Sequence, residues 1–292
     1  MITAEILEAA SQLEIRARHR MSSLLEGSYR TAFRGSSMQF KEFRPYEPGD
    51  DIRHMSWTVT ARTGRPTVKI FEQERELDVI LMVDTSGSSL LGGSRKRKID
   101  MYAEVAAMIG LSAIDAGDNF GLMLFNESVT SYLPAAHRRD QVRTALTQLL
   151  GETPRGKKAD ISVAVEFAAR MLPHRSLTMI LSDFWVPAFE EALTAAARRH
   201  EFILLNGFED EERGQGLNGL HELTDPETGD IYLLDGRSPK TRQKLQTVFV
   251  DHLAHVEGIA ERTRSGCLSL SVEDDYVQRL VLYFERRGPV RL

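Results

Sequence analysis

The sequence predicts an α/β fold: a doubly wound, mostly parallel sheet with a small N-terminal helix and a β-rich subdomain ahead of it. Two observations carry this prediction. Several short runs, such as DVILMVD at 78–84, are apolar almost from end to end, which is typical of strands buried on both faces of a parallel sheet. These runs alternate with longer helical stretches, and such alternation favours a sheet with helices on both faces.

Composition narrows the class of protein. The 292 residues are 42% hydrophobic and 27% charged with a formal net charge of -5, which is ordinary for a globular protein and lacks the basic excess of a nucleic-acid or membrane-surface binder. The single cysteine, Cys267, excludes an intramolecular disulfide and a cysteine-based zinc site. The first residues lack the apolar core of a signal peptide, and no run approaches the roughly 18 apolar residues of a membrane span. We therefore expect a cytoplasmic protein.

The N-terminal part divides into a helix and a β-rich unit. The first 28 residues are expected to form an amphipathic helix, because apolar residues recur there at three- and four-residue spacings: Ile6, Leu7, Ala10, Leu13 and Ala17. Short alternating segments at 38–43 and 67–71 predict strands, separated by breaks such as Pro48-Gly49. The domain boundaries predicted are 1–76 for the helix and β-rich subdomain and 77–292 for the α/β domain.

The elements of the α/β domain follow from the same patterns. Strands are expected at 78–84, 119–125, 128–134, 177–183, 201–206 and 259–263. The second and third of these are separated only by Asn126-Glu127, which favours a hairpin. Helices are expected at 95–116, 137–150, 160–172, 187–199, 238–257 and 273–287. The acidic, glycine-rich segment 207–219 is expected to be a mobile surface loop, and 222–235 a hairpin with its turn at Pro226–Gly229.

Polar residues end two of the predicted strands. Asp84-Thr85-Ser86-Gly87-Ser88 begins at the end of one, and Asp183 ends the other. In an open parallel sheet, ligands bind outside the carboxyl ends of strands where the strand order reverses. Ser86 and Ser88 could turn to one side of a tight loop and ligate Mg²⁺, while Asp84 and Asp183 hold waters and supply negative charge. The alternative is that Asp84 and Ser86 only satisfy backbone groups in a strand-to-helix turn.

The arrangement resembles the metal-ion-dependent adhesion site of von Willebrand A domains. The upstream segment FRPYEPGDDIRHMSWTVTARTGRPTVKIFEQERELDVILMVDTS resembles the signature of the bacterial family called domain of unknown function 58, as does the late segment DPETGDIYLLD. The matching residues upstream are Arg44, Tyr46, Pro48, Gly49, Asp50, Arg53, Trp57, Ala61, Arg62, Lys69 and Glu74. The resemblance covers roughly residues 20 to 290 and implies a sheet of von Willebrand A type. Members of that family are typically paired with MoxR-type AAA+ ATPases, so the resemblance implies an adaptor or substrate-engaging partner of such an ATPase. It implies no catalytic activity.

One position departs from the adhesion-site pattern. Such sites take a further direct ligand from a threonine in a later loop, and aligning KKADISVAV with that loop puts Ala159 at its position. A methyl group cannot ligate, so the site is expected to be weak, completed by Asp160 or Ser162, or vestigial. The candidate ligands for Mg²⁺ are therefore Asp84, Ser86, Ser88, Asp160 and Asp183.

Two further segments admit a structural and a functional interpretation. In RPYEPGDDIRHMSW, we expect Arg44, Asp50 and Arg53 to pair and to seat the β-rich subdomain on the α/β domain, with Trp57 filling the join; the alternative is a docking surface. The basic run Arg95–Lys98 is expected to be a solvated helix start, although positive charge there opposes the helix dipole; the alternative is that it attracts an acidic partner near the DTSGS loop.

Signs of catalysis are weak. A phosphatase of the haloacid dehalogenase type needs an aspartate two residues after its nucleophile, where this chain has Ser86. No Gly-x-Ser-x-Gly or His-Glu-x-x-His motif occurs, and Cys267 is expected to be a core residue. We therefore expect a protein-interaction module, not an enzyme. A carboxylate of the partner would fill an open coordination position of a bound Mg²⁺. Without metal, the partner would hydrogen-bond to the same loops. The rival is a metal-dependent hydrolase of phosphoesters that uses Asp84 and Asp183 around a catalytic ion, with Asp160 as the best available base.

Overall fold

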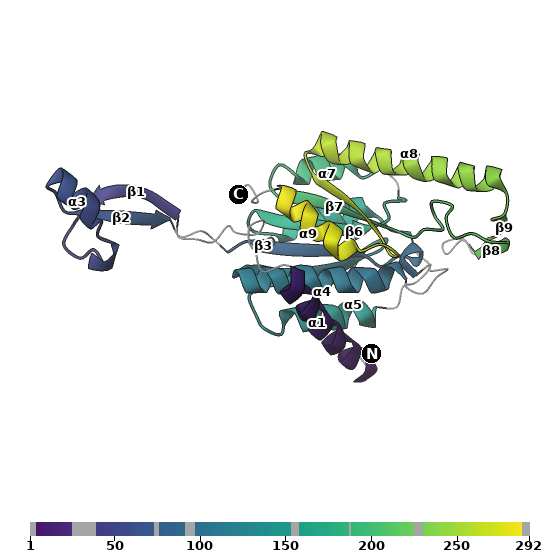
Figure 1. The fold of residues 1–292 in the computed structure, drawn as a ribbon, viewed down its shortest axis with the longest axis horizontal. Helices are drawn as coiled ribbons and strands as arrows, with labels where there is room; N and C mark the ends of the chain where they lie inside the picture. The colour runs from purple at the N-terminus through teal and green to yellow at the C-terminus, as the bar shows by residue number, and fades with distance from the viewer. Residues whose placement is uncertain are drawn as a thin grey trace.

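The computed structural model of the protein describes residues 4–24, 39–72, 76–90, 97–152, 158–186, 188–224 and 230–287. Its centre is a six-stranded sheet of β3 (Asp78–Asp84), β4 (Asn119–Phe125), β5 (Val129–Ala136), β6 (Ser176–Ser182), β7 (Glu201–Phe208) and β10 (Gly266–Ser271). The strand order is β10-β7-β6-β3-β4-β5, and Figure 1 shows β7, β6 and β3 side by side in it. Neighbouring strands are parallel except β4 and β5, which form the predicted antiparallel hairpin. The doubly wound, mostly parallel sheet is confirmed, and its strand order reverses between β3 and β6.

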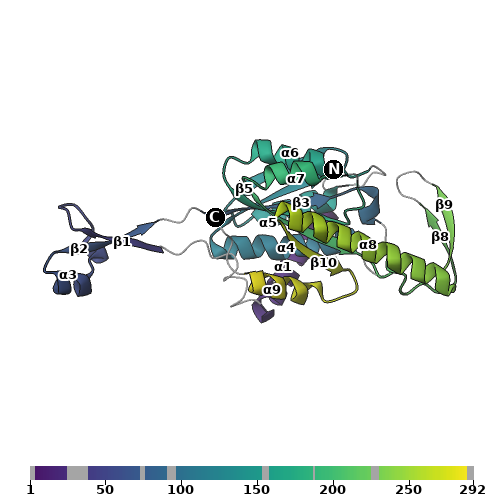
Figure 2. The ribbon, with the colours of Figure 1, turned by 90° about the horizontal axis from the view of Figure 1, so that it is seen from above.

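Helices cover both faces of this sheet. One face carries α1 (Ala4–Leu24), α4 (Lys98–Ala116), α5 (Gln141–Gly151) and α9 (Tyr276–Arg287). The other carries α6 (Ile161–Met171), α7 (Glu190–Ala196) and α8 (Pro239–Thr263). Figure 2 shows α6 and α7 on the opposite side of the sheet from α1, α4 and α9. Because both faces are covered, the central strands must be apolar throughout, which is the pattern that the sequence carries.

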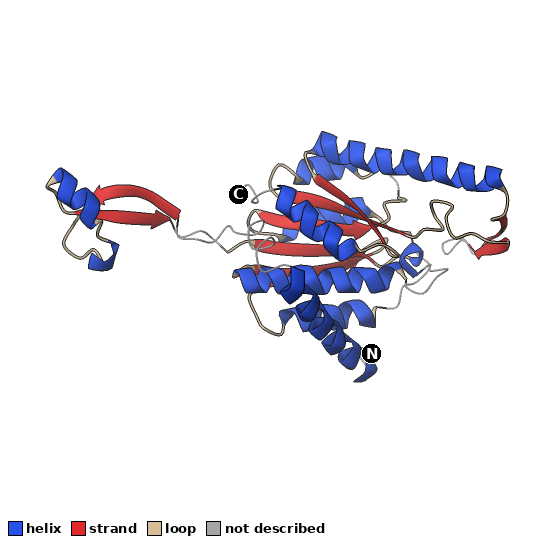
Figure 3. Ribbon diagram, in the orientation of Figure 1, coloured by secondary structure: helices blue, strands red, loops and turns tan. Residues whose placement is uncertain are grey.

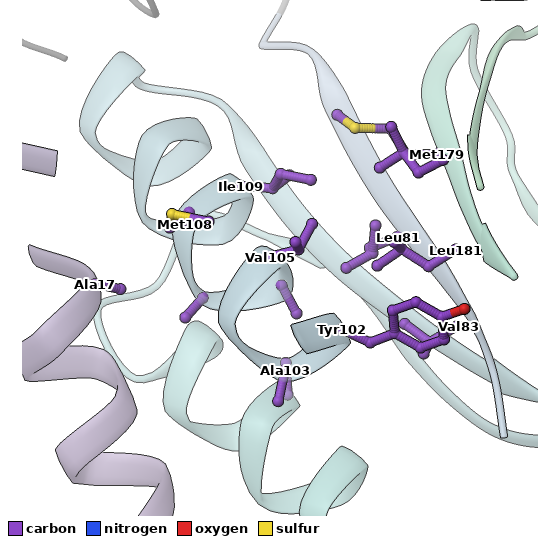
Figure 4. Close-up of a cluster of buried hydrophobic side chains, with 14 of the residues drawn as sticks. Ala17, Leu81, Val83, Tyr102, Ala103, Val105, Met108, Ile109, Met179 and Leu181 are labelled. Carbon is purple, nitrogen blue, oxygen red and sulfur yellow. The ribbon is translucent and has the colours of Figure 1, made fainter. Parts of the chain in front are cut away.

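Alternate residues of the strands enter two separate cores. Leu81 and Val83 point to the α4 side, whereas Ile80 and Met82 point to the α6 side. Figure 4 shows the first core, in which Val105 and other residues of α4 lie against the side chains of β3 and β6. Burying side chains of this size stabilises a fold by about 1.5–3 kcal/mol each.

The amphipathic N-terminal helix is confirmed, and it packs on α4 and α5. Ala10, Leu13 and Ala17 are buried, but Leu7 is 49% exposed, so the buried stripe is narrower than predicted. By packing, α1 belongs with the α/β domain. The division of the chain at residue 76 stays a prediction.

The predicted strand at 259–263 is wrong. These residues form the last turns of α8, which begins at the N-cap Ser238 and ends at Arg264, whose φ of 56° gives a left-handed C-cap. Ile259, Ala260 and Thr263 are buried because they continue the helical stripe of Phe249 and Val256. The sixth strand is β10, seven residues further on than predicted (Gly266 against 259).

The β-rich subdomain is a two-stranded hairpin of β1 (Gln39–Pro45) and β2 (Thr67–Glu72), and its connection contains the short helices η1 (Ile52–His54) and α3 (Trp57–Thr63) (Figure 3). Met38, the predicted first residue of β1, lies outside the described residues. Arg44 pairs with Asp50 at 2.7 Å as expected, whereas Arg53 pairs with Asp51 at 2.9 Å. Trp57 is 65% exposed. The prediction that Trp57 fills a buried join is therefore wrong.

A second hairpin, of β8 (Leu220–Thr224) and β9 (Ile231–Asp235), confirms the prediction for 222–235, although its turn at Pro226–Gly229 lies outside the described residues.

Segment 207–219, expected to be a mobile surface loop, is partly buried. Its hydrogen-bonded turns at 209–215 place the Glu209 side chain in the interior. Among the described helices, none has the length and apolar character needed to cross a membrane.

Candidate functional site

The DTSGS loop starts at the carboxyl end of β3 and continues into the 3-10 helix η2 (Gly87–Leu90). Asp84 is buried, and both of its carboxylate oxygens accept hydrogen bonds: Oδ1 from the Ser86 N–H at 2.8 Å and Oδ2 from the Ser182 hydroxyl at 2.6 Å. Thr85 donates its N–H and its hydroxyl to the Phe125 carbonyl of β4. The loop is thus tied to both neighbouring strands.

The two serines predicted as metal ligands lie together. The Ser86 and Ser88 hydroxyl oxygens are 3.1 Å apart, and the Ser89 hydroxyl donates to the Ser86 carbonyl at 2.7 Å. The alternate spacing does turn the two side chains to one side of the loop. In the described structure, the hydroxyls of Ser86 and Ser88 engage each other.

Asp183 follows β6 at the point where the strand order reverses. Its Oδ1 accepts from the Trp185 N–H at 3.2 Å, and its Oδ2 accepts from the Lys98 ammonium at 2.9 Å. The nearby Ser88 hydroxyl is among the groups that lower the pKa of this carboxylate. The side chains of Lys98 and Asp183 are only 3% and 5% exposed, so the ion pair is shielded from water.

Lys98 also contacts the acidic segment that follows β7. Its ammonium lies 2.8 Å from Glu212 Oε1. Tyr102, one helical turn after Lys98, packs on Gly207 at the end of β7, where an added Cβ would lie 2.5 Å from the tyrosine ring. The expectation that Arg95–Lys98 is a solvated helix start is therefore wrong for Lys98. Arg97 is half-exposed and pairs with Asp100, and residues 95 and 96 lie outside the described residues.

The electrostatics follow from this burial. Burial, and then the charge of Asp183, raise the pKa of the Asp84 carboxyl to about 6. Burial also acts to raise the pKa of Asp183, but the Lys98 ammonium outweighs it and holds that pKa below the ordinary range. For Lys98, burial alone would lower the pKa, and the charges of Asp183 and Glu212 raise it instead. Lys98 is thus a charged ammonium, and Asp183 is ionised beside it.

Ala159 and Asp160 lie just before α6. Ala159 is buried and presents only a methyl group. Asp160 is the N-cap of α6, where its Oδ1 accepts from the Val163 N–H at 3.2 Å, and its own N–H donates to the Asn126 carbonyl at 2.8 Å. Asp160 therefore has a structural task at the start of a helix. Ser162 lies in the first turn of that helix and hydrogen-bonds to the Ala188 carbonyl.

The donor set does not fit a divalent cation. All four carboxylate oxygens of Asp84 and Asp183 already accept hydrogen bonds, and one of the donors is itself a cation. Ala159 supplies no oxygen, and Asp160 caps its own helix. Within the part of the chain that the structure describes, no three His, Cys, Asp or Glu side chains gather as a metal-binding group. We therefore derive no chemistry through a metal here.

Two other residues lie at this edge, Trp185 and His252, and neither was predicted from the sequence. The Trp185 ring is 48% exposed and stacks on His252 of α8 with ring centroids 3.7 Å apart. His252 Nε2 lies 2.8 Å from the Asp183 carbonyl oxygen, which can only accept, so Nε2 carries the proton. Burial lowers the pKa of His252, which favours this neutral ring. Phe184, between Asp183 and Trp185 in the sequence, has a φ of 58°, which is rare for a bulky residue, and its N–H donates to the Ser182 hydroxyl.

A surface hollow of about 510 Å³ opens beside Trp185. It lies between the segment before α6, the segment after β6 and the middle of α8, and its lining includes Ala159, Phe184, Trp185, Val248, His252 and His255. We call the DTSGS loop, residues 183–186 and this hollow the carboxyl-edge face.

The burial of Lys98 could have been predicted from the sequence, because Lys98 shares the helical spacing of the buried residues Tyr102, Val105 and Ile109. The only feature of the sequence that pointed to Trp185 was its nearness to Asp183, and no feature pointed to His252.

The fold and this face define a class: a doubly wound α/β domain with a DxSxS loop at the point where the strand order reverses, as in von Willebrand A domains. The sequence profile of the protein of unknown function DUF58 matches residues 42–255. The chain belongs to this family, as the upstream signature predicted.

The chain is also similar to uncharacterised relatives and to solved structures. Uncharacterised proteins of Mycobacterium tuberculosis (Rv1480) and Mycobacterium bovis (Mb1516) are each 29% identical over 300 residues, covering 97% of this chain and 91% of each relative. The chain is also similar to the crystal structure of the conserved hypothetical protein BatB from Bacteroides thetaiotaomicron, at 15% identity and a TM-score of 0.46, covering 72% of this chain and 97% of BatB. The SpRpn10 VWA domain is similar at 11% identity and a TM-score of 0.43, covering 71% of this chain and 94% of that domain.

Proposed function

We propose that this chain is a protein-interaction module that binds its partner through the carboxyl-edge face. The observation that carries the proposal is Trp185, a half-exposed tryptophan held in one orientation by its stack on His252. It stands beside a hollow and directly after Asp183. A large, pre-positioned aromatic side chain next to a recess is the usual centre of a protein-binding hot spot, because little side-chain entropy is lost on binding.

The rest of the face supports the same function. Val248, 44% exposed, adds apolar surface from α8, and the exposed Lys158 and Asp251 give the hollow a charged rim. An apolar centre inside a polar rim is the usual anatomy of a protein interface. The partner would hydrogen-bond to the DTSGS loop and insert a side chain beside Trp185. The rival hydrolase is not favoured, because Asp84 and Asp183 would have to give up the Ser182 and Lys98 contacts to hold a catalytic ion.

The partner that we propose is a MoxR-type AAA+ ATPase. Support comes from membership of the DUF58 family, because the resemblance to that family implies pairing with such ATPases. In this role the chain acts as an adaptor that engages the ATPase or its protein client, and it catalyses no reaction itself. A cytoplasmic location, where the ATPase has access to ATP, belongs to the same proposal.

The test is binding of the purified full chain to a purified MoxR-type ATPase, measured by biolayer interferometry. We expect Trp185→Ala to weaken binding at least about 10-fold, because truncation of a hot-spot tryptophan costs about 2 kcal/mol or more. The matched control is Trp57→Ala, which removes the other tryptophan of the chain from the β1–β2 unit, where it is 65% exposed against 48% for Trp185.

The two tryptophan variants decide the proposal only if both keep the wild-type melting profile. Normal binding by Trp185→Ala together with loss of binding by Trp57→Ala would place the interface on the β1–β2 unit. Failure of the wild-type chain to bind the ATPase would reject this partner.

A further inference from the structure

The Lys98 ammonium contacts one of the carboxylates that the adhesion-site pattern assigns to its metal ion. It contacts Asp183, the carboxylate that ends β6, at 2.9 Å, and it is shielded from water along with that carboxylate. Lys98 reaches this position from the first turn of α4, the helix that follows the DTSGS loop. The cation therefore comes from the same βα unit as the loop.

The carboxylates around Lys98 need a cation. Asp183 is buried, Glu212 is three-quarters buried, and Asp84 is buried nearby, close enough for its pKa to respond to the charge of Asp183. Ionised groups taken out of water are strongly destabilising unless an opposite charge compensates them. Lys98 is in contact with two of the three, and it is fixed there by the chain.

A divalent ion would compete with Lys98 for the same oxygen atoms. Any ion that ligates Asp183 Oδ2 would lie within a few ångströms of the ammonium, and like charges so close in a buried site repel strongly. The loss of the threonine hydroxyl at Ala159 removes a ligand that would have favoured the metal. The Lys98 ammonium and the methyl group of Ala159 thus both disfavour a bound divalent ion.

We propose that Lys98 is the resident cation of the carboxyl-edge face, and that its ammonium takes the structural place of the metal ion of an adhesion site. It joins the Asp183 segment to the acidic segment 209–214 through Glu212. The face is therefore in its binding arrangement without a divalent ion. This inference goes beyond the proposed function and does not depend on which partner binds.

The test compares thermal melts of the EDTA-dialysed full chain with and without millimolar MgCl₂, together with calorimetric Mg²⁺ titrations. We expect the wild-type melting temperature to be the same in both buffers and the titration to show no heat that depends on Asp84. Lys98→Met keeps the length of the side chain and removes its charge, and we expect it to lower the melting temperature by roughly 10 °C. Arg97→Met, the matched control, removes a half-exposed cation from the preceding position and should change it by less than about 2 °C.

A second substitution separates charge from packing. In Lys98→Met, Asp183→Asn should recover part of the lost melting temperature, because it removes the unpaired carboxylate. If Lys98→Met does not fold, the double variant Lys98→Met/Asp183→Asn and the wild-type melts and titrations with Mg²⁺ still test the proposal. A wild-type melting temperature that rises in Mg²⁺, with the rise abolished in Asp84→Asn, would overturn the proposal. So would a Lys98→Met protein that melts like wild type.

Discussion

The behaviour of Lys98 depends on groups far away in the sequence. At the start of α4 its charge opposes the helix dipole, which costs about 0.3–1 kcal/mol at an exposed site. Asp183 and Glu212, 85 and 114 positions away along the chain, offset this cost at contact distance. The same residue would be a poorly placed surface charge without these partners.

Cys267 gives a prediction at the same scale. Its thiol is partly covered on β10, and burial raises its pKa to about 12. Little thiolate, the reactive form, is present at pH 8 in the folded protein. We expect iodoacetamide to label the folded chain at least about 100-fold more slowly than the chain in urea, since the free thiol has a pKa of about 8.5. The measurement is mass spectrometry of the labelled fraction with time, and equal rates in both states would show that the thiol is accessible.

Asp160 shows how a helix end can imitate a ligand position. It lies beside Ala159, where the adhesion-site pattern places a ligand, but its carboxylate caps α6. The cap satisfies a backbone N–H that has no partner within the helix. Asp160 thus marks the start of α6, and its residue type and its place in the sequence also suit a metal site.

Substitutions at Asp160 separate these two tasks. We expect Asp160→Ala to lower the free energy of unfolding by about 1 kcal/mol, the typical value of an N-cap. Asp160→Ser keeps a capping oxygen and should lose less than half of that. Urea unfolding in EDTA measures both, and Mg²⁺ should change neither difference. A serine variant as unstable as the alanine variant would contradict the capping role.

At the scale of the whole molecule, the chain joins parts that are separated in sequence. Helix α1 packs on α4 and α5, yet the β1–β2 unit lies between α1 and β3 in the sequence. The exposed Trp57 lies on this unit, whose charged residues pair with one another. The unit is therefore stabilised by its own contacts, such as the buried Val68.

Trp57 and Val68 give a paired prediction for this unit. We expect Trp57→Ala to reduce the free energy of unfolding by less than about 1 kcal/mol, because most of the ring is already in water. Val68→Ala, at a buried position of the same unit, should cost about 2 kcal/mol from lost burial and an unfilled cavity. Denaturant unfolding followed by circular dichroism checks both values. A loss of 3 kcal/mol or more for Trp57→Ala, about that of a buried tryptophan, would restore the join that the structure excludes.

The sequence by itself determined the central sheet. The apolar runs of β3, β4, β6 and β7 identify strands buried on both faces, because this requirement is local to each strand. The same local logic placed DTSGS and Asp183 at one edge of the sheet. It failed at 259–263, where the short apolar run also suited the last turns of a helix, and only the packing of α8 on the sheet distinguishes the two.

Only the tertiary structure decided how the polar groups pair. A periodic pattern states which face of a helix is buried, but it does not name the group that a buried charge will meet. Asp84 meets Ser182, and Lys98 meets Asp183 and Glu212, because the sheet order brings the ends of β3, β6 and β7 together. Electrostatic energy depends on distance and burial in the folded state, and neither can be read from spacing along the chain.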